Sequence, residues 1–211
     1  DQPAPLFFVS PDQINFQVPM GTPSSGSAEI QVVRKSTGQI VAVGCSAARA
    51  GTKPDGTQRW SCTAGGVLMD VASPALFAGP GYSAGKGQIA ALNEDNTINS
   101  STNRISRGKV IQLFGTGQGF VPGAPPDGEA PTGAISTPDR PEVLVGTAFV
   151  NPSDVQYSGL APYLVGVWQL NVRIPEITAP LDQVDVVIRY KSIYSNNLTP
   201  SLIQTTIAVK Q

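Results

Sequence analysis

The residue types that most often carry enzyme chemistry are scarce in this chain. Its 211 residues include no histidine, which removes Ser-His-Asp and Cys-His arrangements and the commonest zinc ligand. Two acidic pairs, Glu94/Asp95 and Asp182/Asp185, remain as carboxylates that could act together on a glycosidic bond. Acids so close together on turns and strand faces are usually solvated charges. We therefore expect that the protein is not an enzyme.

The segment "NEDNTIN", residues 93–99, has oxygen-bearing side chains at every second position. These are Asn93, Asp95, Thr97 and Asn99, and calcium loops use the same spacing. The segment lacks the glycine and the final bidentate glutamate of such loops, so a hairpin turn with Asp95-Asn96 at its tip is the alternative interpretation. Calcium at these four residues is the one cofactor that the sequence leaves open, and otherwise we expect none.

Cys45 and Cys62 are the only cysteines, and they flank a polar segment that turns at Pro54-Asp55-Gly56. A disulfide between them would close a hairpin and contribute about 3 kcal/mol in the chain-entropy model. The alternative is a pair of buried free thiols. Disulfides persist in oxidising compartments, so this pairing favours an extracellular protein.

Other motifs would also suit the surface of an exported protein. Asn99 and Asn197 begin sequences of the N-glycosylation type, although unmodified surface asparagines are the alternative. Five aromatic side chains could stack on sugars if they were exposed in one row; they are Tyr82, Tyr157, Tyr163, Trp60 and Trp168. Trp168 alternates with Leu170, which instead predicts a core position for it.

The composition predicts an all-β chain. Its 22 glycines and 19 prolines make long helices hard to form, and apolar residues alternate with polar ones in segments such as "AEIQVVR", "KVIQLFG" and "QVDVVIRY". Only 14% of the residues are charged and the net charge is −1, so nucleic acid is not an expected partner. No run of about 20 apolar residues occurs, so we expect no membrane span.

Two phrases of the sequence are nearly the same. "QINFQVP" (13–19) and "QLNVRIP" (169–175) lie in longer matching segments of about thirty residues that begin at Ala4 and Ala161. Each copy contains Ala-Pro, an apolar strand, a Gln-x-Asn strand, a proline, a polar turn and an alternating strand that ends in arginine. This duplication predicts two related β-sandwich domains, 1–78 and 107–211, joined by a connecting segment, 79–106.

The two copies have unequal surroundings. Strands are predicted before the second copy, at 108–120, 142–150 and 154–159, whereas three residues precede the first copy. We therefore expect the first domain to lack its opening strands and to expose apolar faces and unpaired edges. A cleaved precursor segment, the segment 79–106 or another molecule could fill the gap.

The last of these possibilities is β-strand complementation, and the N-terminal residues suit it. Three large apolar residues in a row follow a proline in the candidate assembly strand, which consists of Pro5, Leu6, Phe7, Phe8 and Val9. A strand added to a sheet edge gains main-chain hydrogen bonds, and head-to-tail donation builds a fibre because it does not close on itself. An ordinary core strand is the alternative interpretation.

Several motifs together resemble a known family. "APLFFVSPDQINFQVP", "GQIAALNEDNTINSSTNRISRGKVIQLFGTGQGF" and "YSGLAPYLVGVWQLNVRIP" closely resemble the uncharacterised C-terminal domain family of large secreted proteins from Solibacter and other Acidobacteria. The resemblance covers nearly the whole chain. It implies export and tandem Ig-like sandwich domains of the TIG type, to which "VIQLFGTGQGF" is also similar, and it implies no known catalysis or ligand.

The expected function follows from these features. We expect an extracellular structural protein at a bacterial surface that assembles with copies of itself into a fibre or matrix by strand complementation. The alternative is an adhesion module that binds carbohydrate or a surface protein through its loops. The proline-rich segment 122–141 is the first candidate for contact with a partner or neighbouring subunit, because loops of this length are usually functional or disordered.

Overall fold

The computed structural model describes residues 2–44, 48–52, 58–62, 66–79, 87–195 and 205–211. In this part the chain forms 22 strands and one short 3-10 helix, η1 (Pro152–Asp154), so the all-β prediction is confirmed. No α-helix occurs among the described residues, in keeping with the glycine and proline content. The strands belong to two compact units, which we describe separately.

The contacts divide the chain at other places than the sequence predicts. The smaller unit contains Asp1–Gln2 and Pro19–Val71, and the larger unit contains Pro3–Val18 and Ala72–Gln211. The described part of the predicted connecting segment 79–106 contributes three strands to the larger unit, and these are β10 (Gly87–Gln88), β11 (Ala91–Leu92) and β12 (Ile105–Ser106). This segment is therefore part of the sandwich and not only a connection.

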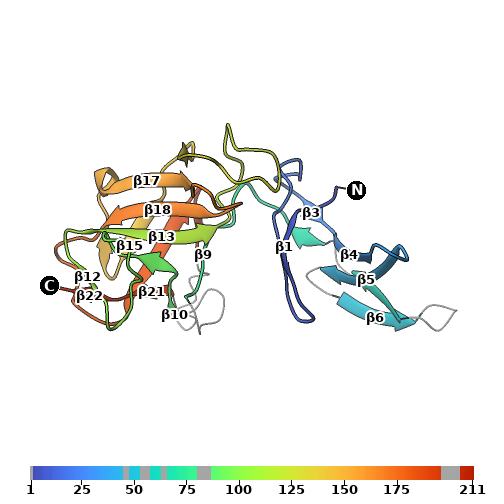
Figure 1. Ribbon diagram of the computed structural model, residues 1–211, viewed down its shortest axis with the longest axis horizontal. Helices are drawn as coiled ribbons and strands as arrows, with labels where there is room; N and C mark the ends of the chain where they lie inside the picture. The colour runs from blue at the N-terminus through green and yellow to red at the C-terminus, as the bar shows by residue number, and fades with distance from the viewer. Residues whose placement is uncertain (1, 45–47, 53–57, 63–65, 80–86, 196–204) are drawn as a thin grey trace. The chain divides into compact units, whose positions relative to one another are not determined.

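The larger unit is a β-sandwich with two six-stranded sheets (Figure 1). The β13 sheet has the strand order β11-β13-β18-β17-β14, and β9 also pairs with β13. Besides β11, its strands have the bounds β9 (Ala75–Leu76), β13 (Val110–Thr116), β14 (Ile135–Ser136), β17 (Val155–Leu160) and β18 (Trp168–Arg173). The β19 sheet has the strand order β10-β21-β19-β15-β16, and β20 also pairs with β19. Besides β10, its strands have the bounds β15 (Glu142–Val145), β16 (Ala148–Phe149), β19 (Val184–Tyr190), β20 (Ile193–Tyr194) and β21 (Thr205–Ile207).

Alternating side chains from both sheets form one hydrophobic core. In β13 and β19 every second residue is buried, as the period of a half-buried strand requires. Trp168 of β18 and Tyr190 of β19 meet across the sandwich with ring centroids 5.2 Å apart. Trp168 is only 1% exposed, so the prediction of a core position for it is confirmed.

The strand directions fit an Ig-like sandwich. Nearly all pairs in the larger unit are antiparallel. Two pairs are parallel and join the start of the sandwich to its last strands: β10 pairs with β21, and β12 pairs with β22 (Val209–Lys210). The fold therefore places the segments 87–106 and 205–210 side by side, which brings the polar side chains of the 93–103 loop next to the chain's last strands.

The smaller unit contains three two-stranded sheets in its described part (Figure 1). They are β3 (Ser27–Ala28) with β8 (Val67–Leu68), β4 (Ile30–Arg34) with β5 (Gln39–Gly44), and β6 (Ala48–Thr52) with β7 (Gln58–Cys62). The hydrophobic core cluster contains no described residue of this unit. Instead, its exposed apolar side chains include Met20, Val33, Ile40, Val41, Val67, Leu68 and Val71.

The two copies of the repeated phrase differ where the apolar strand was predicted. In the first copy it forms β1 (Leu6–Val9), which pairs with β2 (Ile14–Phe16). In the second copy the corresponding residues form a turn before β18, with positive φ values of 64° at Tyr163 and 66° at Gly166. Glycine adopts such a φ without steric cost. The residue of the first copy that corresponds to Gly166 is a valine, Val9. The second apolar strand was therefore predicted wrongly.

Candidate functional site

The candidate assembly strand lies on the surface. All four residues of β1 are exposed, with exposed fractions of 60% for Leu6, 46% for Phe7, 49% for Phe8 and 61% for Val9. The turn after β1 is closed by Ser10, whose N–H donates to the Gln13 carbonyl oxygen (2.8 Å) and whose Oγ accepts from the Gln13 N–H (3.1 Å). The hairpin therefore holds an apolar strand in extended form without burying it.

One edge of β1 has no strand beside it among the described residues. The β1–β2 sheet has two strands only, and β1 is antiparallel to β2. Side chains on a strand alternate between its two faces, so a strand with only apolar residues is suited to burial on both faces. An exposed strand of this kind is a template for pairing with another strand.

The strands of the smaller unit also have open edges. Within the described residues β4 pairs with β5 alone, whereas β19, its counterpart in the repeat, pairs with β15 on one edge and with β20 and β21 on the other. The strand β5 follows β4 through a short turn, as β20 follows β19. The open edge of β4 therefore corresponds to the edge of β19 that β15 occupies.

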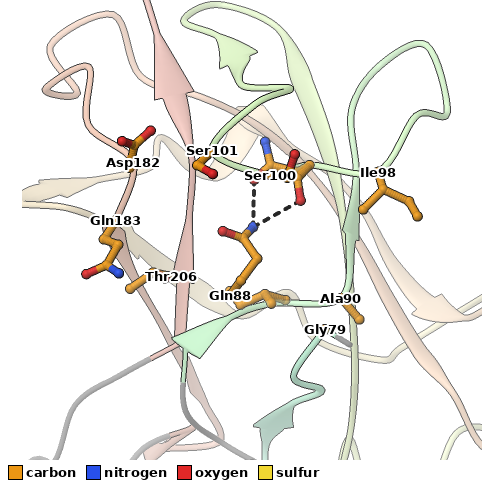
Figure 2. A pocket seen from close by; sticks show the side chains of 11 residues that line it. Gly79, Gln88, Ala90, Ile98, Ser100, Ser101, Asp182, Gln183 and Thr206 are labelled. Atoms are coloured by element: carbon orange, nitrogen blue, oxygen red, sulfur yellow. Dashed lines mark hydrogen bonds between the residues drawn. The ribbon is translucent and has the colours of Figure 1, made fainter. Parts of the chain in front are cut away.

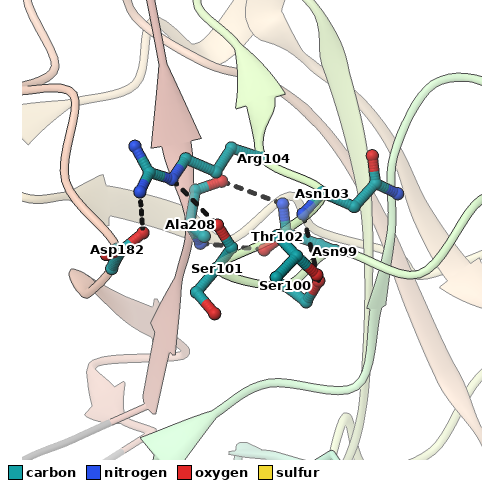
Figure 3. A network of polar contacts seen from close by, with 8 residues as sticks. All are labelled: Asn99, Ser100, Ser101, Thr102, Asn103, Arg104, Asp182 and Ala208. Atoms are coloured by element: carbon teal, nitrogen blue, oxygen red, sulfur yellow. Dashed lines mark hydrogen bonds and ion pairs between the residues drawn. The ribbon is translucent and has the colours of Figure 1, made fainter.

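Asn99 is buried and belongs to a network of polar contacts, of which Figure 3 shows its contact with Ala208. Its side chain is wholly buried and pairs with Ala208 as a neighbouring backbone would, because Nδ2 donates to the Ala208 carbonyl oxygen (2.9 Å) and Oδ1 accepts from the Ala208 N–H (2.8 Å). Nδ2 also donates to Asn93 Oδ1 (2.9 Å), and Oδ1 also accepts from Gln88 Nε2 (2.8 Å). Every hydrogen-bonding group of this amide is used.

The proposed calcium ligands form a hairpin turn. Asn93 N–H donates to the Thr97 carbonyl oxygen (2.8 Å), and Asn96 stands at the tip with φ of 63°. Asp95 Oδ1 accepts from the Thr97 hydroxyl (2.5 Å) and N–H (3.0 Å), and these bonds lower the pKa of Asp95. A calcium ion would have to displace these donors from Asp95 and the amide partners from Asn93 and Asn99, so calcium binding here stays a prediction.

The modification sites have different positions. Asn99 has no exposed surface, so a glycan on its Nδ2 would find no space and would remove hydrogen bonds to Ala208 and Asn93. Asn197 and Cys45 lie outside the described residues. Cys62 is the last residue of β7, and its side chain also lies outside the described part, so the disulfide stays a prediction.

The acidic pairs are ion-paired or solvated. Glu94 contacts Lys109 Nζ at 2.9 Å, and hydrogen bonds from Lys109 and the Val110 N–H lower the pKa of its carboxyl group. Asp182 contacts Arg104 at 2.6 Å, and Asp185 is exposed on β19. A general acid needs a raised carboxyl pKa. The opposite shift at Glu94 suits a surface charge, and the described residues contain no cluster of three or more His, Cys, Asp or Glu that could hold a metal.

A pocket of about 390 Å³ lies beside Asn99 (Figure 2). Its polar lining includes Gln88, Ser100, Ser101, Asp182, Gln183 and Thr206. The Gln88 amide reaches across to Asn99, donating to both its Oδ1 (2.8 Å) and its carbonyl oxygen (3.3 Å). Sequence reasoning missed the structural role of Gln88 and Asn99, and the only sequence signal for it is the crowding of asparagines between residues 93 and 103.

The proline-rich segment 122–141 is anchored to the sandwich at several points. Thr137 Oγ1 lies 2.6 Å from Ser158 Oγ, which accepts from Trp168 Nε1 at 3.0 Å, so the segment is tied to the core. The Pro131 carbonyl oxygen accepts from the Tyr163 N–H (2.8 Å), and the Gly128 N–H donates to Gln17 Oε1 (2.8 Å). Contact of this segment with a partner stays a prediction.

Comparisons of the chain with family models, with curated proteins and with solved structures give no match. The resemblance to the C-terminal domain family of secreted Acidobacteria proteins therefore stays a prediction. In the part of the chain that the structure describes, no helix has the length and apolar character needed to cross a membrane.

Proposed function

We propose that this chain is a non-enzymatic extracellular structural protein of a bacterial surface, and that copies of it assemble into a fibre or matrix by β-strand complementation. The observation that carries the proposal is β1, a strand of four apolar residues whose side chains are all exposed and whose outer edge pairs with no described strand. Such a strand is a liability in a lone molecule. It becomes useful when it is a binding element.

The strand β1 is the donor in this assembly. Burying a leucine, valine or phenylalanine side chain stabilises a contact by roughly 1.5–3 kcal/mol, and β1 offers four such side chains. The main chain of its outer edge supplies hydrogen bonds that fix the register. No charged residue interrupts β1, so the contact requires no ion pair to be desolvated.

The smaller unit of a neighbouring copy is the acceptor. The incoming β1 takes the place on β4 that β15 holds on β19, and it runs antiparallel to β4 as β15 does to β19. Val33 of β4 is apolar and exposed, so it gains cover when a strand is added at this edge. Donor and acceptor differ, so each copy can bind two neighbours and the assembly grows as a fibre.

The test is the size and shape of the assembly over a range of concentrations, measured by light scattering and negative-stain electron microscopy. The full chain is expected to form filaments with a regular axial repeat, and deletion of residues 1–10 is expected to leave folded monomers. Asp12→Ala is the matched control, because it changes the exposed turn of the hairpin and leaves β1 intact. A monodisperse full-length monomer, or filaments that survive the deletion unchanged, would refute strand donation by β1.

A further inference from the structure

A shallow groove of about 430 Å³ lies on the outer face of the β13 sheet, away from β1 in sequence and in pairing. It is lined by Gln112, Ala134, Tyr157, Pro162, Gln169 and Asn171. The strand register explains this gathering, because Asn171 of β18 lies opposite Gln112 of β13 on one side and opposite Tyr157 of β17 on the other. Among the residues that the structure describes, no charged side chain lines the groove.

The amide side chains of the groove form a hydrogen-bonded row. Gln112 Nε2 donates to Asn96 Oδ1 (2.8 Å), and Gln169 Nε2 donates to Asn171 Oδ1 (2.8 Å) and to Gln112 Oε1 (3.3 Å). These bonds fix the orientation of three amides in the groove. Gln169 Oε1 and Asn171 Nδ2 have no hydrogen-bond partner among the described residues, so the row offers one acceptor and one donor on neighbouring side chains.

One tyrosine, Tyr157, lines the groove beside this row. Tyr157 donates its hydroxyl proton to the Leu160 carbonyl oxygen (2.7 Å) and accepts from the Ile135 N–H (3.1 Å). Its hydroxyl lies over Gly159, where a β-carbon would stand only 2.5 Å from it, so the glycine makes room for the ring. Tyr163 follows the groove residue Pro162, is 76% exposed, and is held at a φ of 64°, a backbone conformation that is costly for a tyrosine.

We propose that this groove binds a neutral polysaccharide. The free acceptor of Gln169 and the free donor of Asn171 match a pair of sugar hydroxyl groups, each of which can donate and accept. Tyr157 and Tyr163 offer apolar ring surface to the faces of the sugar rings, and the uncharged lining favours a neutral glycan over an acidic one. The site belongs to the larger unit alone and does not depend on strand exchange through β1.

Native gel electrophoresis of the full chain through gels that contain a soluble polysaccharide tests this inference. Four neutral polymers, hydroxyethylcellulose, arabinoxylan, galactomannan and dextran, are compared with the acidic polygalacturonate. At least one neutral polymer is expected to slow the protein. Gln169→Ala and Asn171→Ala should each weaken that binding about tenfold, because each variant loses a hydrogen bond to the sugar that water does not replace in the complex. Tyr163→Ala should also weaken the binding, because it removes the stacking of the ring on the sugar.

Gln156→Ala is the matched control, because Gln156 is an exposed amide on β17 that does not line the groove. This variant should bind as the unaltered chain does, and near-ultraviolet circular dichroism should show that all variants keep Trp168 packed in the core. The inference fails if no neutral polymer slows the unaltered chain, if only polygalacturonate does, or if both amide variants bind normally. Deletion of residues 1–10 should abolish assembly but not binding, so the two proposals can fail separately.

Discussion

At the scale of single residues, Asn99 shows how a side chain can replace main chain in a sheet. Its amide accepts from and donates to Ala208, so the loop at 93–103 is joined to the residue between β21 and β22 as if by a strand pair. A buried side-chain amide stabilises the fold in this way only when its N–H donors and its oxygen acceptor all have hydrogen-bond partners. Gln88 and Asn93 complete the set.

Replacement of Asn99 by alanine should therefore be costly. The substitution leaves the Ala208 N–H and carbonyl groups buried without this partner, and the free energy of unfolding should fall by about 3 kcal/mol. Urea unfolding followed by tryptophan fluorescence measures the change. Ser101→Ala removes the same glycosylation sequence at an exposed position and should change the stability by less than about 0.5 kcal/mol; equal losses in both variants would contradict a structural role for Asn99.

Glu94 gives a prediction about pH. The hydrogen bonds from Lys109 and Val110 lower the pKa of its carboxyl group from the ordinary value of 4.5. The contribution of Glu94 to stability is therefore present above that value and disappears as the pH falls through the lowered pKa of the folded state. Glu94→Gln should be less stable than the unaltered chain at neutral pH, and the difference in stability should shrink as the pH falls below 4.5 and through the lowered pKa of the folded state. A difference that persists in acid would show that the ion pair is not its source.

At the scale of elements, the alternation of the long strands predicted the sandwich well. In β13, β18 and β19 the inward side chains are those that the period of two indicates. Short strands such as β10 and β12, with two residues each, carry too little pattern to be predicted, so the sequence does not reveal the strands within the segment 79–106. Their positions depend on pairing with β21 and β22, more than 100 residues later in the sequence.

The pairing of β9 with β13 depends on one glycine. A β-carbon on Gly115 would collide with the Ala75 carbonyl oxygen, so Gly115→Ala should push β9 from the sheet edge and lower the free energy of unfolding by about 2 kcal/mol. Gly133→Ala is the matched control, since no atom lies within 4 Å of its added carbon. Thermal unfolding of both variants measures the difference, and similar melting temperatures would refute the steric explanation.

The groove on the β13 sheet could be predicted only in part. The sequence identified Tyr157 and Tyr163 as aromatic candidates; Tyr157 lines the groove, and Tyr163 follows the groove residue Pro162 in the chain. It gave no reason to single out Gln112, Gln169 and Asn171, because polar residues at outward positions of a strand are ordinary. Only the register between β13, β17 and β18 makes them neighbours. The sequence left β1 open between a donor strand and an ordinary core strand; its four residues are exposed, and its role in assembly stays a prediction.

At the scale of the whole molecule, the core is unevenly distributed. All residues of the hydrophobic core cluster belong to the larger unit, and the described strands of the smaller unit occur in pairs. Two-stranded sheets are marginally stable alone. The proposed assembly would give the smaller unit the third strand that it needs.

Hydrogen exchange can test this unevenness directly. In dilute solution the amides of β4 and β5 should exchange much faster than those of β13, β18 and β19, because few buried contacts oppose local opening. As the concentration rises and copies assemble, the β4 amides should become protected while those of β13 stay unchanged. Protection of β4 that is already complete in the dilute monomer would mean that the smaller unit is stable without a donated strand.

The parallel pairs of the larger unit have a mechanical consequence. The strands β10 and β12, near the start of the sandwich, lie beside β21 and β22, near its end, and point the same way. A pull on the two ends of this unit would slide these strands past each other, so that tension loads the hydrogen bonds of each pair together instead of peeling them apart in turn. A thread in which such units are linked end to end would resist stretching up to a high force and then yield abruptly.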